Sequence, residues 1–99
     1  MWVNWTDAAL SDLLNITEFI GKDDADAADA LSEKLQNAAD GLVDFPRKGG
    51  VGRIGGTREL VAHNRYILVY AILEDRIDIL SVLHTSRQYP PDQAACGSS

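Results

Sequence analysis

The chain has 99 residues, of which 45% are hydrophobic and 24% charged, and its formal net charge is −6 at pH 7. This length fits one domain, and the composition lies outside the range typical of disordered proteins. The acidic balance disfavours nonspecific binding to nucleic acid or anionic membranes, because such binding depends on a surplus of Lys and Arg.

Neither a targeting signal nor a membrane span is predicted. Residues 1–7 lack a basic region followed by an apolar one, and the longest apolar run, 66–73, is far shorter than the ~20 residues that cross a bilayer. The single cysteine, Cys96, cannot form an internal disulfide or a cysteine-based metal site. We therefore expect a cytoplasmic protein.

The N-terminal half predicts a short strand and two helices. Residues 2–5 are typical of a strand, the hydroxyl of Thr6 is suited to cap a first helix, and Asp23-Asp24 is suited to cap a second that ends before Phe45-Pro46. Apolar residues recur at helical spacing in both segments: Ala9, Leu13, Ile16 and Ile20, then Ala28, Leu31, Leu35, Ala38 and Leu42. Because the link is short, the helices are predicted to pack as an antiparallel hairpin.

The C-terminal half predicts three strands, 57–63, 66–73 and 76–83, which two-residue links join into an antiparallel meander. The expected fold class is therefore α+β, in the order β-α-α-β-β-β, with the helical hairpin packed on a small twisted antiparallel sheet. We expect a single domain over 1–91 and a flexible tail over 92–99, which is small and polar.

Residues 47–56, with five glycines and three basic residues, are predicted to form a loop. The stretch 50–55 matches G-x-G-x-x-G, but it follows a helix and enters a strand, which is the reverse of a phosphate-binding loop. Two interpretations remain: a connector whose glycines adopt positive φ, or a mobile basic loop that contacts a macromolecule. The charge distribution predicts that an anion would bind in the half of the chain that contains this segment, because residues 1–44 carry −8 and residues 45–91 carry +3.

Three residues form a second candidate site, and a fourth, Arg58, needs a partner of its own. His84, Arg87 and Tyr89 follow the last predicted strand, and this trio is suited to hold and protonate a phosphodiester. The alternative is structural, with His84 bonded to a backbone group and Arg87 paired with a helix acid. Arg58 alternates with Leu60 and is therefore expected on the core side of its strand, where it requires a carboxylate partner or a ligand.

No metal or cofactor is predicted. The chain has two histidines without metal-ligand spacing, and His63 is assigned to strand packing. Trp2 and Trp5 are expected on opposite faces of the first strand, with at least one in the core.

Several motifs together point to a known family. They are Val3-Asn4-Trp5-Thr6, the Phe-Pro that ends residues 42–46, Gly52-Arg53, Gly56-Thr57-Arg58-Glu59-Leu60-Val61, Tyr66-Ile67-Leu68-Val69-Tyr70, and Leu-His-x-x-Arg-x-x-Pro at 83–90. In these motifs, which span nearly the whole chain, the sequence resembles the ParE/RelE superfamily of bacterial type II toxins. The expected element order agrees with the fold of that family.

The resemblance implies a toxin that a cognate antitoxin, ParD-like or RelB-like, neutralises in a hetero-oligomeric complex. RelE-like members cleave mRNA on the ribosome, and here the resemblance would assign catalysis to Arg58, His84, Arg87 and Tyr89. ParE-like members poison DNA gyrase, and here target binding would fall to Arg47, Lys48, Arg53, Arg58 and Arg87. Many relatives have Gly-Arg where this chain has Gly49-Gly50.

The net charge of −6 favours the ParE-like branch, because docking among ribosomal RNA phosphates would meet repulsion from the acidic hairpin. The alternatives are a RelE-like ribosome-dependent endonuclease and an inactive relative that only binds antitoxin. We expect the antitoxin to lie along the hairpin groove and to add a strand to an open sheet edge.

Overall fold

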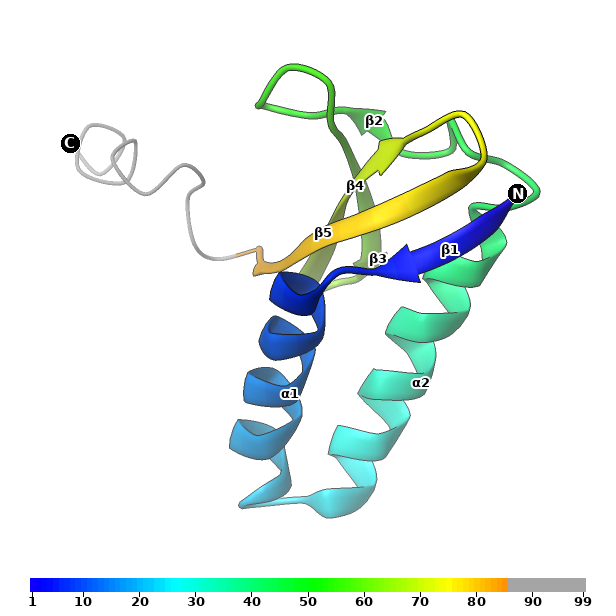
Figure 1. The fold of residues 1–99 in the computed structure, drawn as a ribbon. Helices are drawn as coiled ribbons and strands as arrows, with labels where there is room; N and C mark the ends of the chain where they lie inside the picture. The colour runs from blue at the N-terminus through cyan, green and yellow to red at the C-terminus, as the bar shows by residue number, and fades with distance from the viewer. Residues whose placement is uncertain (86–99) are drawn as a thin grey trace, which may run out of the picture.

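The computed structural model describes residues 1–85, which form a helical hairpin on one face of a five-stranded sheet (Figure 1). The elements in chain order are β1 (Trp2–Trp5), α1 (Asp7–Gly21), α2 (Ala25–Gly41), β2 (Gly50–Val51), β3 (Arg58–His63), β4 (Tyr66–Ile72) and β5 (Arg76–His84). The α+β class and the expected element order are confirmed, apart from β2. The expected domain limit at residue 91 and the tail over 92–99 lie outside the described residues.

The sheet is mixed rather than wholly antiparallel. Its strand order is β1-β5-β4-β3-β2, and β1 runs parallel to β5, from Trp2 opposite Arg76 to Trp5 opposite Ile79. Parallel neighbours need a long connection, which the hairpin and the meander together provide. The side-chain amide of Asn4 supports this pairing by donating to Asp78 Oδ1 at 3.0 Å.

The segment 47–56, expected as a loop, contains the two-residue strand β2. Its residues pair with the start of β3, Gly50 opposite Glu59 and Val51 opposite Arg58. The chain reverses between them in a turn in which Thr57 N–H donates to Ile54 O at 3.1 Å and Gly56 has φ of 82°. Within residues 1–85, the positive φ expected for the glycines of this segment occurs at Gly56 alone.

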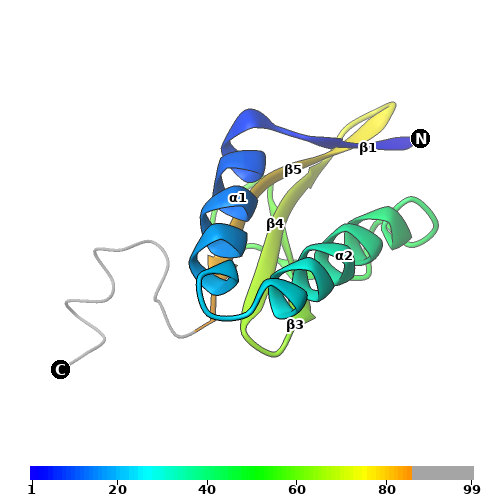
Figure 2. The same ribbon diagram turned by 90° about the horizontal axis from the view of Figure 1, so that it is seen from below.

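Both predicted helix caps are present. Thr6 Oγ1 accepts from Ala9 N–H at 3.3 Å and also donates to Ile79 O at 2.7 Å, so the cap ties α1 to the sheet. Asp24 Oδ1 accepts from Ala27 N–H at 3.1 Å at the start of α2. The two helices lie side by side on the same face, α1 against β5 and α2 against β3 (Figure 2).

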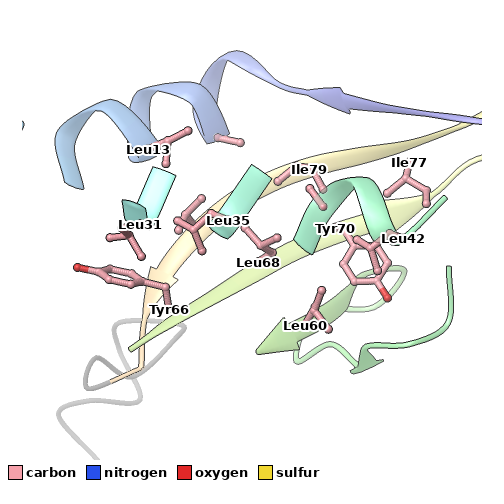
Figure 3. Close-up of a cluster of buried hydrophobic side chains, with 13 residues drawn as sticks. Leu13, Leu31, Leu35, Leu42, Leu60, Tyr66, Leu68, Tyr70, Ile77 and Ile79 are labelled. Carbon is pink, nitrogen blue, oxygen red and sulfur yellow. The ribbon is translucent and has the colours of Figure 1, made fainter. Parts of the chain in front are cut away.

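The core lies between the hairpin and the sheet (Figure 3). Its fully buried large side chains are Leu35, Leu42, Leu68, Tyr70, Ile77 and Ile79. Along β4 the core-facing side chains run from Tyr66, beside Leu31, to Tyr70, beside Leu42 (Figure 3). Trp5 packs against this core while Trp2 is exposed, as the alternation predicted.

Candidate functional site

Strand β4 separates two groups of candidate residues. Arg58 lies opposite Tyr70 in the β3–β4 register, and His84 lies opposite Tyr66 in the β4–β5 register. Tyr66 and Tyr70 are four residues apart, which in a strand is about 13 Å. The structure therefore places Arg58 and His84 near opposite ends of β4 and does not bring them together.

The first group consists of Arg58 and Tyr70. It holds the backbone of residues 46–49, which we call the basic segment. The Tyr70 hydroxyl donates to Pro46 O at 2.7 Å and accepts from Gly49 N–H at 3.1 Å. Arg58 Nη2 donates to Gly49 O at 2.6 Å and to Arg47 O at 3.3 Å. Two side chains from neighbouring strands thus fix one short stretch of chain.

Arg58 was expected to need a carboxylate or a ligand, and its partners in the structure are carbonyl oxygens instead. Both bonds come from Nη2, while the buried Nε has no hydrogen-bond partner. The side chain is half-buried, on the same side of the sheet as Leu60. Its Nη2 is therefore occupied by the backbone of the basic segment.

The three basic residues of the 47–56 segment have different environments. Arg47 and Lys48 are exposed, and neither forms an ion pair within residues 1–85. Arg53 is held inside the β2–β3 hairpin by Glu59: its Nε lies 3.5 Å from Oε1, and its N–H donates to Oε2 at 3.2 Å. Within the 47–56 segment, Arg47 and Lys48 are therefore the exposed cations that no carboxylate of the described residues pairs.

The second group, His63, Tyr66 and His84, lies at a cleft of about 730 Å³ between the two helices and the adjacent ends of β3, β4 and β5, which we call the histidine cleft. Its apolar wall includes Ile16, Phe19, Ile20 and Leu31. On its sheet side, the Tyr66 ring lies between two imidazoles, with ring centroids 5.8 Å from His63 and 5.1 Å from His84. The cleft therefore has apolar side chains on its helix side and the rings of two histidines and a tyrosine on its sheet side.

His63 is held in its neutral form. Its Nδ1 accepts a hydrogen bond from Arg65 N–H at 3.1 Å. Partial burial, and then the positive charges of Lys34 and Arg65, lower the pKa of His63 below its ordinary value of 6.5. At neutral pH this imidazole is therefore an acceptor at Nδ1, and its sequence assignment to strand packing fits its position at the end of β3.

Two predicted site residues, Arg87 and Tyr89, lie outside the described residues. Sequence reasoning missed Tyr70 and Gly49, which together with Arg58 fix the basic segment. A signal for Tyr70 was available, because a tyrosine within an apolar central strand requires a partner for its hydroxyl. The identity of that partner, 24 residues earlier in the chain, had no signal.

In the part of the chain that the structure describes, no group of three His, Cys, Asp or Glu side chains could hold a metal ion. The helices within the same residues are all too short or too polar to cross a membrane.

Comparison with known proteins identifies the family of this chain. A family model described as the ParE toxin of the type II toxin-antitoxin system, parDE, matches residues 3–89. The chain belongs to the ParE toxin family. This membership confirms the resemblance to the ParE/RelE superfamily inferred from sequence motifs.

Two curated relatives of this ParE-family toxin carry toxin names. The protein named "Putative toxin Y4kP" from Sinorhizobium fredii is 43% identical over 89 residues, covering 89% of this chain and 92% of that protein. The protein named "Toxin RelE2" from Caulobacter vibrioides is 33% identical over 85 residues, covering 86% of this chain and 96% of that protein.

A solved structure shares the fold. It is a chain of the chromosomal ParDE TA system from P. aeruginosa, with a TM-score of 0.77 and 18% sequence identity, and the match covers 85% of this chain and 95% of that chain. At this identity the match establishes the fold of the ParE-family toxin.

Proposed function

We propose that this ParE-family toxin inhibits DNA gyrase and is neutralised by a cognate antitoxin. The observation that carries the proposal is the match of residues 3–89 to the ParE toxin family. Supporting it, Arg58 bonds to backbone carbonyls at a distance from His84, whereas a phosphodiester-cleaving site would need both at one substrate. A toxin that acts by binding needs no such assembly.

The target contact is assigned to the exposed cations Arg47 and Lys48 of the basic segment. The remaining basic residues expected at the target-binding site were Arg53, Arg58 and Arg87. Arg53 is neutralised by Glu59, and Arg58 bonds to the basic segment itself, so both support the surface rather than extend it. A local pair of cations suits a small acidic patch on a protein, which need contact only this segment, whereas the extended phosphate backbone of nucleic acid would also meet repulsion from the acidic half of the chain.

The alternative is a RelE-like ribosome-dependent mRNA endonuclease that uses Arg58, His84, Arg87 and Tyr89. Two observations favour it: one curated relative carries the name RelE2, and His84 lies against the Tyr66 ring beside an open cleft. An inactive relative that only binds antitoxin is the third candidate. Assays of gyrase inhibition, ribosome-dependent mRNA cleavage and cell growth together separate all three.

The antitoxin is assigned to the histidine cleft and to the neighbouring edge of β3. Phe19, at the cleft, is 72% exposed, which is a large apolar area to leave in water. Within the described residues β2 pairs only with Arg58 and Glu59, so Leu60–His63 keep an open strand edge. An antitoxin segment that folds on binding can use both features, since one buries apolar side chains and the other accepts a strand.

The first test replaces both exposed cations, Arg47→Ala with Lys48→Ala, and measures inhibition of gyrase supercoiling and formation of the cleavage complex. The wild-type protein is expected to inhibit, and the double variant to need about tenfold more protein, as expected from the loss of about 1.4 kcal/mol of favourable charge contact. The cognate antitoxin is expected to reverse the inhibition.

The matched control is the double variant Lys22→Ala with Lys34→Ala, which removes the same charge from the hairpin and is expected to inhibit like wild type. Wild-type protein without effect on gyrase would contradict the proposal. Ribosome-dependent mRNA cleavage in that case would support the RelE-like alternative, and unimpaired growth of cells expressing the toxin alone would support the inactive relative.

A further inference from the structure

Within residues 1–85, the hydrogen bonds from the side chains of the sheet to the basic segment all go to its backbone. Tyr70 bonds to Pro46 O and Gly49 N–H, and Arg58 bonds to the carbonyls of Arg47 and Gly49. These bonds fix the course of the chain, while the side chains of Arg47 and Lys48 remain exposed. Because Arg58 and Tyr70 lie opposite each other in the sheet, they act on the segment as a pair.

Close approach of the backbone shows how tightly the segment lies on the sheet. Gly49 is buried, and a Cβ there would come within 2.6 Å of Glu59 O and 2.8 Å of the Tyr70 hydroxyl. A Cβ at the neighbouring Gly50 would meet nothing within 4 Å. A glycine is therefore required at 49 because the segment contacts strand β3 directly, whereas Gly50 is free of that restriction.

We propose that Arg58 and Tyr70 are positioning residues that hold the basic segment in one conformation, so that Arg47 and Lys48 form a preordered cationic surface for an acidic protein surface. A preordered pair loses less conformational entropy on binding than one on a mobile loop. The assignment of Arg47 and Lys48 to a target rests on the proposed function, whereas the fixing of the segment does not.

The proposal changes the role expected for Arg58. A guanidinium that contacted the target would need to present its nitrogens to solvent, but here Nη2 is occupied by two carbonyls and Nε is buried. If Arg58 contacted the target directly, its substitution would weaken target binding, whereas substitution of the uncharged Tyr70 would not. Positioning predicts that removal of either side chain has the same kind of effect and that both effects act through Arg47 and Lys48.

The first arm of the test measures amide hydrogen exchange of the protein alone, in Tyr70→Phe and Arg58→Gln. Exchange at residues 47–49 is expected to accelerate at least tenfold relative to amides of α2 and β4, because the Gly49 amide loses its acceptor in one variant and the segment loses its other anchor in the second. Tyr66→Phe is the matched control, since it changes the same residue type on the same strand and no hydrogen bond of the Tyr66 hydroxyl occurs within residues 1–85. Unchanged local exchange in both variants would overturn the proposal.

A second pair of variants applies if Tyr70→Phe or Arg58→Gln does not fold. Gly49→Ala is expected to accelerate the same amides, and Gly50→Ala to leave them unchanged, because only the first places a methyl group against Glu59 O. Equal exchange in the two alanine variants would contradict the close contact on which the proposal depends.

The second arm measures gyrase inhibition in a double-mutant cycle. Arg58→Gln and Tyr70→Phe are each expected to weaken inhibition about as much as removal of Arg47 and Lys48, and to have no further effect once those cations are gone. Weakening by Arg58→Gln alone, additive with loss of the cations, would make Arg58 a direct contact and overturn the proposal. If wild-type protein does not inhibit gyrase, the proposed function fails, and the exchange arm still decides whether the pair fixes the segment.

Discussion

In the histidine cleft, the surroundings of His63 lower the pKa of its imidazole. Its imidazole is partly buried, lies near the cations Lys34 and Arg65, and accepts a hydrogen bond at Nδ1 that a proton would break. All three influences favour the neutral ring, so its pKa in the folded protein lies below 6.5. Protonation therefore opposes folding at this position.

The stability of the toxin is expected to decrease as the pH falls from 7.5 towards 5.5, in part through His63. Because its folded pKa is lowered, the unfolded chain binds the proton first, so stability present above 6.5 is lost as the pH falls through the lower folded value. Urea unfolding of wild type and His63→Gln at several pH values measures the effect, and the variant is expected to show a shallower loss. The two proteins differ at this one side chain, so parallel pH profiles would contradict the assignment to His63.

Among the elements, α1 and β5 are joined by one carboxylate. Asp12 Oδ2 accepts from Ser81 Oγ at 2.8 Å and from Val82 N–H at 3.1 Å. This bond lies close to the register shift between β4 and β5 at Val69/Tyr70, where the strand ladder is interrupted. β1 pairs with β5 only as far as Ile79, and beyond that point a helix side chain accepts from a backbone donor of β5.

Asp12→Ala is expected to lower the free energy of unfolding by about 1–3 kcal/mol, because it leaves the partly buried Val82 N–H without its acceptor. Urea denaturation measures the change. The matched control is Asp29→Ala, which removes the same charge from an exposed position on α2 and is expected to change stability by less than about 0.5 kcal/mol. Equal losses in both variants would assign the effect to net charge rather than to the bond to β5.

The elements that the sequence predicted are those with local signals. Thr6 and Asp24 cap their helices through contacts three residues away, and the meander follows from two-residue links. Strand β2 was missed because its two residues, Gly50 and Val51, lack the alternation of a longer strand and form a strand only by pairing with β3. The same holds at the site, where the partners of Arg58 and Tyr70 lie 9 to 24 residues away and follow only from the fold.

At the scale of the whole molecule, negative and positive charge are separated along the sequence, and the two proposed contact surfaces are separated along β4. Residues 1–44, which include the hairpin, carry −8, whereas the basic segment and the sheet belong to the half that carries +3. The basic segment lies beside Tyr70 and the histidine cleft beside Tyr66, so the two proposed contact surfaces are near opposite ends of β4. An antitoxin in the cleft would then leave the basic segment uncovered unless it also follows the β3 edge towards Arg58.

Binding of the antitoxin is expected to stabilise the toxin strongly, because a chain of this size has only about 5–15 kcal/mol of folding stability and leaves Phe19 in water. At a hundredfold excess of antitoxin over its Kd, linkage adds about 2.7 kcal/mol, which corresponds to a rise in Tm of about 10 °C or more. Thermal unfolding of the toxin with increasing antitoxin measures this rise. Phe19→Ala is expected to reduce it, whereas Leu14→Ala, at another exposed apolar position of α1 that does not line the cleft, is expected to leave it unchanged. A rise that Leu14→Ala reduces and Phe19→Ala does not would place the antitoxin on the outer face of α1 instead of in the histidine cleft.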